Sequence, residues 1–180
     1  MSPGDLFHQL FNAPTEAAVD TVLVGWPSAG AARVNWHPLA SNDKNFGVIE
    51  NQQSSPIAAL IEKITNSIDA ILMRRCYELG MDPQSAQAPP SMEDAVLKFF
   101  GPQSGNWCEN WNLSSFRQKQ AEEIQILADG PRMDTSLVIY DNGEGQHPKD
   151  FEATFLSLLK GNKNDIRFVQ GKYNMGGTGA

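Results

Sequence analysis

Three polar side chains, Glu62, Asn66 and Asp69, are spaced i, i+4 and i+7 in a stretch with helical periodicity. At about 100° per residue they fall on one stripe of a helix, beside an aliphatic arc. The arc consists of Ile57, Ala58, Ile61, Ile64, Ile68, Ile71 and Leu72. A carboxylate can act as a general base, and an amide oxygen is a ligand that Mg²⁺ accepts. The spacing therefore predicts polar groups at the rim of a core, where ligand pockets lie; an ordinary polar helix flank is the alternative interpretation.

A second candidate follows an apolar run at residues 136–140, which continues directly into Asp141-x-Gly143-x-Gly145. A strand would fix the Asp141 carboxylate at a pocket floor, and the glycines would let a flat ligand lie against the main chain. A carboxylate accepts a hydrogen bond from the exocyclic amine of adenine and repels the carbonyl oxygen of guanine. The pattern favours an adenine site, although Asp-Asn-Gly is also an ordinary turn.

The third candidate is a glycine cluster near the end of the sequence. It consists of Gly176, Gly177, Thr178 and Gly179. Its backbone N–H groups could cradle phosphate, and the preceding residues 160–172 carry a local charge of 4 − 1 = +3, with Lys163 among the cations. A P-loop is excluded, because Gly171-Lys172 is followed by Tyr173 rather than serine or threonine. A flexible tail is the alternative for this cluster.

Taken together, the three motifs resemble those of the GHKL ATPases in order and separation. They are Glu62-x-x-x-Asn66-x-x-Asp69-Ala70, then Asp141-x-Gly143-x-Gly145, then the glycines of residues 176–179. This superfamily comprises gyrase-type topoisomerases, heat-shock chaperone ATPases, histidine kinases and MutL-type mismatch-repair proteins. The resemblance covers about residues 47–180. It implies a Bergerat fold, an α+β two-layer sandwich in which ATP lies between the motif-bearing helix and a mobile lid.

The resemblance also implies roles for individual residues and for ligands. Glu62 would be the general base, Asn66 the Mg²⁺ ligand, and Asp141 the partner of the adenine amine in a pocket that includes Gly143. The remaining implied nucleotide-site residues are Asp69, Gly145, Lys163, and the lid residues Gly176, Gly177, Thr178 and Gly179. ATP hydrolysis with Mg²⁺ would switch the conformation of a larger protein, and many relatives form homodimers when nucleotide binds.

The elements that must position these residues are indicated by caps and turns. A helix is predicted over 56–79, with Ser54 or Ser55 as cap and Gly80 as its stop. Strands are predicted at 46–51, 124–127 and 136–140, and further helices at 92–100, capped by Ser91, and 151–159. We expect residues 1–46, with a short helix starting at Thr15, to be an arm, and about 81–120 to be an insertion. The later strands of the Bergerat fold are missing, so we expect an N-terminal part of a larger protein.

Composition restricts the possible partners. The net charge of 14 − 21 = −7 disfavours direct binding of nucleic acid through a broad basic face. No run approaches the roughly 18 apolar residues of a membrane span, and the N-terminus lacks the pattern of a secretory signal. Cys76 and Cys108 have no metal-binding spacing. A cytoplasmic protein is the simplest interpretation.

Two other functions remain open on the sequence. One is a histidine-kinase catalytic domain, which the Ser-Ile-Asp-Ala after Asn66 and the lack of a preceding phospho-acceptor helix disfavour. The other is a non-catalytic interaction module that keeps the fold and binds partners through the 1–46 arm or through Trp107 and Trp111. Binding of an ATP analogue in Mg²⁺-containing buffer distinguishes the ATPase from the interaction module.

Overall fold

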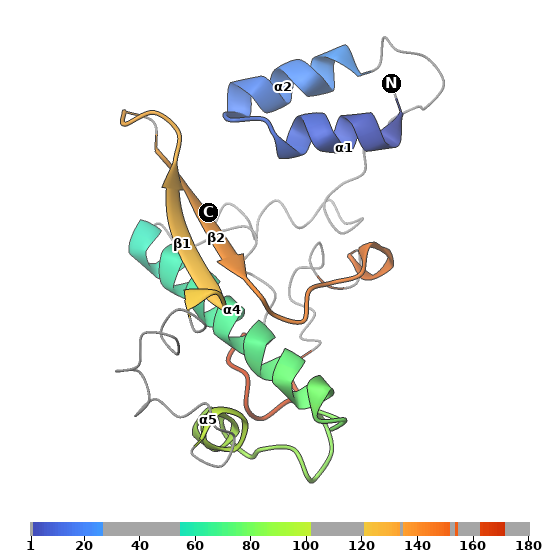
Figure 1. Ribbon diagram of the computed structural model, residues 1–180, viewed down its shortest axis with the longest axis vertical. Helices are drawn as coiled ribbons and strands as arrows, with labels where there is room; N and C mark the ends of the chain where they lie inside the picture. Colours follow the sequence, from blue (N-terminus) through green and yellow to red (C-terminus); the bar gives the residue numbers. More distant parts are fainter. Residues whose placement is uncertain are drawn as a thin grey trace. The chain divides into compact units, whose positions relative to one another are not determined.

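The computed structural model describes residues 2–26, 55–101, 121–133, 135–151, 154 and 163–171. The helices are α1 (Pro3–Phe11), α2 (Glu16–Gly25), α4 (Pro56–Glu78) and α5 (Met92–Phe100), the strands are β1 (Ile124–Asp129) and β2 (Ser136–Asp141), and η5 (Pro148–Asp150) is a short 3-10 helix (Figure 1). The chain divides into two compact units. One contains Met1–His37 and Ala128–Leu137, and the other contains Pro38–Leu127 and Val138–Ala180.

Some predicted features lie outside the described residues. They are the strand 46–51, most of the helix 151–159, Trp107, Trp111, Cys108 and the glycine cluster at 176–179. Their predicted positions and roles therefore remain predictions. Among the helices that are described, none combines the length and the apolar character that crossing a membrane requires.

The N-terminal residues form a pair of short helices that pack on each other. Ser2 and Asp5 cap α1 reciprocally, and the Thr15 side chain accepts from the backbone N–H of Ala18 at the start of α2. The predicted helix start at Thr15 is confirmed, whereas α1 was not predicted. Neither helix buries a residue, and Phe7 and Phe11 stack at 5.8 Å between ring centroids while staying exposed.

Helix α4 has the ends that the sequence predicts. Ser55 is the N-cap and accepts from the N–H of Ala58, and Pro56 occupies the first helical position. At the other end, Gly80 adopts a φ of 67°, and its N–H donates to the carbonyl of Tyr77. The Met81 N–H reaches the carbonyl of Cys76 at 3.1 Å. These two bonds form a Schellman motif, which requires the left-handed conformation that glycine adopts easily.

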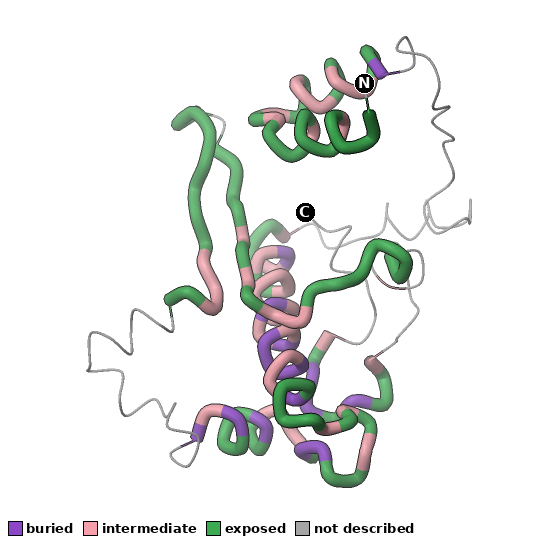
Figure 2. The backbone as a smooth tube through the Cα atoms, turned by 45° about the vertical axis from the view of Figure 1, so that its right-hand side comes forward, coloured by how far each residue is buried: buried purple, intermediate pink, exposed green. Residues whose placement is uncertain are grey.

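The predicted apolar arc of α4 is only partly right, because Ile57 is 70% exposed and Ile61 is 58% exposed. The fully buried side of the helix is instead centred on Asp69, Leu72 and Cys76 (Figure 2). Helical periodicity shows which residues share a face, but the segments that cover the face lie elsewhere in the sequence. Among the described residues, those segments meet the C-terminal half of α4.

The hydrophobic core joins three distant parts of the chain. It contains Leu72, Met73 and Cys76 of α4, Ala88, Ala95 and Phe99, and Ile166, Phe168 and Val169. Phe99 of α5 meets Phe168 edge to face, with ring centroids 6.0 Å apart. Ser91 caps α5 as predicted. Ala88, Ala95 and Phe99, from the start of the expected insertion, thus contribute to the core, and the expectation of an insertion stays a prediction.

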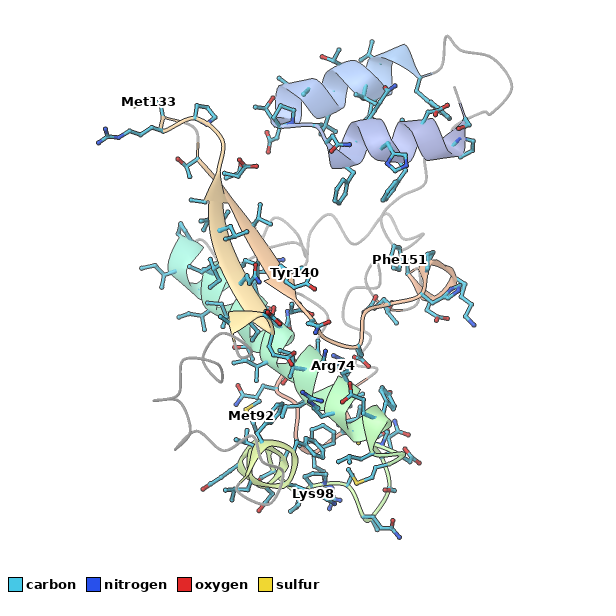
Figure 3. All side chains as sticks on the ribbon, viewed as in Figure 1. Arg74, Met92, Lys98, Met133, Tyr140 and Phe151 are labelled. Carbon is cyan, nitrogen blue, oxygen red and sulfur yellow. The ribbon has the colours of Figure 1, made fainter. Side chains whose placement is uncertain are left out.

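Strands β1 and β2 form a two-stranded antiparallel sheet, as the hairpin pattern predicts. Gly130, at a φ of 87°, supplies the left-handed residue of the turn. The start of β1 is fixed to α4 by ion pairs, because the Glu123 carboxylate lies 2.6 Å from Arg74 and 3.3 Å from Arg75. Arg74 is labelled on the helix in Figure 3. Most residues of these two strands are exposed, and the described ranges contain no further strand, so the Bergerat fold stays a prediction.

The Glu123 ion pairs provide a test of how the hairpin is attached to α4. The Glu123 side chain is 12% exposed and those of Arg74 and Arg75 are 18% and 22% exposed. We expect Glu123→Ala to lower the free energy of unfolding by about 1–2 kcal/mol, because it leaves two partly buried cations without this partner. Glu122→Ala, which removes an exposed carboxylate next to it, should cost under about 0.5 kcal/mol. Urea unfolding measures both, and equal losses would contradict the assigned role.

Candidate functional site

Asp141, at the end of β2, is fixed against the middle of α4. Its Oδ2 atom accepts a hydrogen bond from the Ser67 hydroxyl at 3.0 Å, and its Oδ1 atom accepts from the N–H of Gly143 at 3.0 Å. Ser67 is only 3% exposed, so the bond lies in the helix–strand contact. The predicted position of Asp141 at a strand end is confirmed, and its carboxylate has one defined orientation.

The loop after Asp141 makes a close approach to α4. A Cβ atom at Gly143 would lie 2.9 Å from the carbonyl carbon of Ala70 and 2.7 Å from Asp141 Oδ1. The next residue continues the contact, since the N–H of Glu144 donates to the Ala70 carbonyl at 3.1 Å. Gly143 is thus required for space, whereas Gly145 adopts a φ of 63° and meets open space. The two glycines of the motif serve different physical purposes.

Asp69 is completely buried, and its predicted position at the rim of the core is wrong. Its carboxylate accepts the backbone N–H of Gln170, at 3.0 and 3.1 Å to the two oxygens, and that of Gly171 at 2.7 Å. Hydrogen bonds from backbone N–H groups replace water around a carboxylate and make its burial tolerable.

Asn66 lies against the same segment. A Cβ at Gly171 would be 2.6 Å from Asn66 Oδ1 and 3.2 Å from Asp69 Oδ2, so the amide occupies the space that a side chain at 171 would need. No group of three or more His, Cys, Asp or Glu side chains suited to a metal occurs within the described ranges. A Mg²⁺ ion that keeps its waters and binds phosphate needs only one or two protein oxygens. The Asn66 amide fits this limited role.

Glu144 and Lys163 form an ion pair beside this contact, with Lys163 Nζ 3.5 Å from Glu144 Oε1. Burial raises the pKa of the Glu144 carboxyl, Lys163 lowers it, and the nearby Asp141 and Asp69 add smaller upward contributions. Lys163 therefore has a carboxylate partner in this structure, and its predicted contact with nucleotide stays a prediction. A polyphosphate entering next to these carboxylates would need a divalent cation to offset the repulsion.

Glu62 lies one helical turn before Asn66 and is partly buried. The structure places Asn66 and Asp69 against residues 170–171 and the Asp141–Gly143 loop against Ser67 and Ala70 of the same helix. Lys163 lies beside Glu144. Sequence reasoning missed Ser67 and Glu144. Both adjoin motif residues in the sequence, and helical spacing does not show that a serine next to Asn66 would meet a strand 74 residues later.

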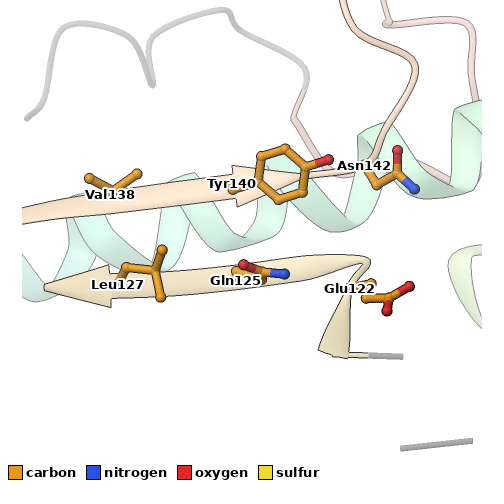
Figure 4. Close-up of a pocket in the computed structure, with 6 residues that line it drawn as sticks. All are labelled: Glu122, Gln125, Leu127, Val138, Tyr140 and Asn142. Carbon is orange, nitrogen blue, oxygen red and sulfur yellow. The ribbon is translucent and has the colours of Figure 1, made fainter. Parts of the chain in front are cut away.

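A separate open depression lies on the hairpin (Figure 4). It is lined by Glu122, Gln125, Leu127, Val138, Tyr140 and Asn142. Successive side chains of a strand point to opposite faces, so this depression is on the face away from the Asp141–Ser67 contact. None of the predicted site residues lines it. We base the candidate site on the hydrogen bonds along α4 and not on this hollow.

The comparisons with known proteins are negative in each case. No protein-family model, no curated protein and no solved structure matches this chain.

Proposed function

We propose that this chain is the ATP-binding part of a GHKL-type ATPase that hydrolyses ATP with Mg²⁺ and thereby switches the conformation of a larger protein. One observation carries the proposal. Two segments that are distant in sequence, the loop 141–144 and the residues 170–171, meet five consecutive residues of α4, from Asn66 to Ala70. This arrangement brings the first two motifs together and supports a nucleotide site built from them, to which the glycines at 176–179 would add the third.

The hydrogen bonds that the Asp141 carboxylate accepts support adenine as the nucleobase. One of its oxygens accepts from the Ser67 hydroxyl and the other from the N–H of Gly143. Each carboxylate oxygen can accept about two hydrogen bonds, so lone pairs remain for the exocyclic amine of adenine. Guanine presents a carbonyl oxygen at that position, which the carboxylate would repel.

The surrounding charges support a metal-bound polyphosphate over a bare one. Asp141 and Asp69 lie close enough to Glu144 to raise the pKa of its carboxyl, and Lys163 is the cation paired with Glu144. Mg²⁺ would bind the Asn66 amide oxygen and phosphate oxygens, and would supply the positive charge that phosphoryl transfer needs. Glu62, one turn away, would activate the attacking water.

The glycines at 176–179 would close over the phosphates, and closure would be the switching step. We place the reaction in the cytoplasm and expect nucleotide-dependent homodimerisation. The buried Cys76 is a free thiol, which fits a reducing compartment.

Asp141→Asn tests the proposed base contact without disturbing the fold. The new amide oxygen can still accept from Gly143, and the Ser67 hydroxyl can turn to accept from the new NH₂ group. We expect the variant to bind a non-hydrolysable ATP analogue about 10- to 100-fold more weakly, because a hydrogen bond to a charged acceptor contributes about 1.5–3 kcal/mol. Calorimetry in Mg²⁺-containing buffer measures this.

Asp129→Asn is the matched control, since Asp129 is an exposed carboxylate at the other end of the hairpin. Its affinity for the analogue should equal that of the wild type. Equal affinity of the wild type and Asp141→Asn would remove Asp141 from the base contact. Failure of the wild type itself to bind the analogue would replace the ATPase by the interaction module.

The interaction module is the second candidate because of one observation in the N-terminal unit. Phe7 is 60% exposed and Phe11 is 75% exposed, and their rings stack on the same side of α1. Exposed aromatic pairs are common at protein interfaces. This observation does not compete with nucleotide binding by α4, and calorimetry decides between a catalytic and a purely binding role.

A further inference from the structure

We propose that Asp69 is a positioning residue, which holds the backbone of Gln170 and Gly171 in register with Asn66 on α4. The effect of Asp69 on nucleotide binding rests on the proposed function, whereas its role in holding the backbone at residues 170 and 171 does not. The inference differs from the ligand-binding role that the motif resemblance implies for Asp69. It assigns the carboxylate to the protein backbone and not to the nucleotide.

The hydrogen bonds of Asp69 carry the first step. The carboxylate is 0% exposed and accepts from the N–H groups of two successive residues, Gln170 and Gly171, over 3.1, 3.0 and 2.7 Å. Two adjacent N–H groups that converge on one carboxylate fix the peptide plane between them. Buried and satisfied in this way, Asp69 has little capacity left for a ligand.

The position of Gly171 supplies the second step. Asn66 and Asp69 lie nearly one turn apart on α4, and both border the place where a Cβ of residue 171 would be. The same carboxylate that fixes the Gly171 N–H therefore keeps the backbone of Gly171 close to the Asn66 amide, with no room for a Cβ between them. Any movement of Gly171 away from α4 would free the Asn66 side chain to turn.

The third step follows from the two contacts together. Asn66 is the proposed Mg²⁺ ligand, and Gly171 begins the stretch that leads to the glycines at 176–179. Asp69 sets the geometry of both, so Mg²⁺ binding at Asn66 and the position of the segment 163–171 depend on each other. The adenine contact at Asp141 uses Ser67 and Gly143 instead, and does not depend on this link.

The first experiment uses amide hydrogen exchange of the nucleotide-free protein followed by NMR. Gln170 is an exposed residue, so without the Asp69 bond its amide would exchange fast. We expect the amides of Gln170 and Gly171 to exchange at least about tenfold faster in Asp69→Asn than in the wild type, with amides near Cys76 unchanged. Asparagine keeps one acceptor but turns an NH₂ group toward the N–H donors. Unchanged exchange at both amides would overturn the proposal.

A second pair of variants keeps the test decisive where Asp69→Asn does not fold. Gly171→Ala places a methyl group against the Asn66 amide, and Asn66→Ala removes that amide. We expect Asn66→Ala/Gly171→Ala to have a higher melting temperature than Gly171→Ala alone, because the second change relieves the clash. Strictly additive effects of the two changes on the melting temperature would show that the two residues do not press on each other, and would overturn the link.

The last readout separates this role from a merely structural one. In Gly171→Ala, the affinity for an ATP analogue in the presence of Mg²⁺ should fall about tenfold or more, while the affinity for ADP in EDTA should stay within about twofold of the wild type. Equal losses with and without Mg²⁺ would overturn the coupling. If the wild type binds no nucleotide, the proposed function fails, while the exchange and melting results still decide the role of Asp69.

Discussion

Gly143→Ala is expected to lower the free energy of unfolding by about 3 kcal/mol, the upper end of the usual cost of overpacking. The added methyl group would lie 2.9 Å from the carbonyl carbon of Ala70, in the backbone of a 23-residue helix. It would also lie 2.7 Å from Asp141 Oδ1, which Ser67 and the Gly143 N–H hold in place. Neither neighbour is the free end of a flexible side chain, so the loop must leave α4.

Gly145→Ala is the control for this prediction, because it separates lack of space from backbone strain. Gly145 has a φ of 63°, but its added Cβ would meet no atom within 4 Å. Its replacement should cost about 1 kcal/mol, from the left-handed conformation alone. Urea unfolding of both variants measures the difference. A loss for Gly143→Ala no greater than that for Gly145→Ala would mean that the loop does not pack on α4 as closely as the structure has it.

The features that the sequence predicted correctly are those fixed by a few neighbouring residues. Ser55 and Pro56 start α4, and Gly80 ends it, because capping and the left-handed turn involve groups within one or two turns. The same holds for Ser91 at the start of α5. The hairpin also followed from local information, with two short β-rich runs around a turn at Gly130.

The features that were missed depend on contacts over long separations. Periodicity put Asp69 on a polar stripe, but the N–H groups that allow its burial come from residues 101 and 102 positions later. Ile61 fits the apolar arc by spacing, yet it is 58% exposed because no described segment covers it. Helical periodicity predicts the direction in which a side chain points, but not how deeply other segments bury it.

The candidate site was predictable only where local spacing determines it. The i, i+4 spacing placed Glu62 and Asn66 one turn apart on the helix, and a strand end placed Asp141 at a defined edge. That Ser67, and not Asp69, meets Asp141 depends on which side of α4 the hairpin covers. The Glu123 ion pairs with Arg74 and Arg75 attach the hairpin on that side, and sequence spacing contains no signal for them.

Glu62→Ala is expected to slow the proposed ATP hydrolysis by about 10²- to 10⁴-fold, the usual contribution of a positioned general base. Glu62 precedes Asn66 by one turn of α4, so in the proposed site its carboxylate would face a water next to a phosphate that Mg²⁺ would hold at Asn66. The affinity for a non-hydrolysable analogue should change by less than about threefold, because a general base acts on the attacking water and not on the bound nucleotide.

Steady-state phosphate release measures the turnover of this variant, and calorimetry measures its affinity. Glu93→Ala is the matched control, since it removes the same charge from an exposed position in the first turn of α5. If the loss of one negative charge alone changed the rate, Glu62→Ala and Glu93→Ala would be slowed alike. If Glu62 is the general base, only Glu62→Ala is slowed. Turnover by Glu62→Ala at the rate of Glu93→Ala would assign the proton transfer to another group, and Glu144, whose pKa is raised by burial, would be the next carboxylate to replace.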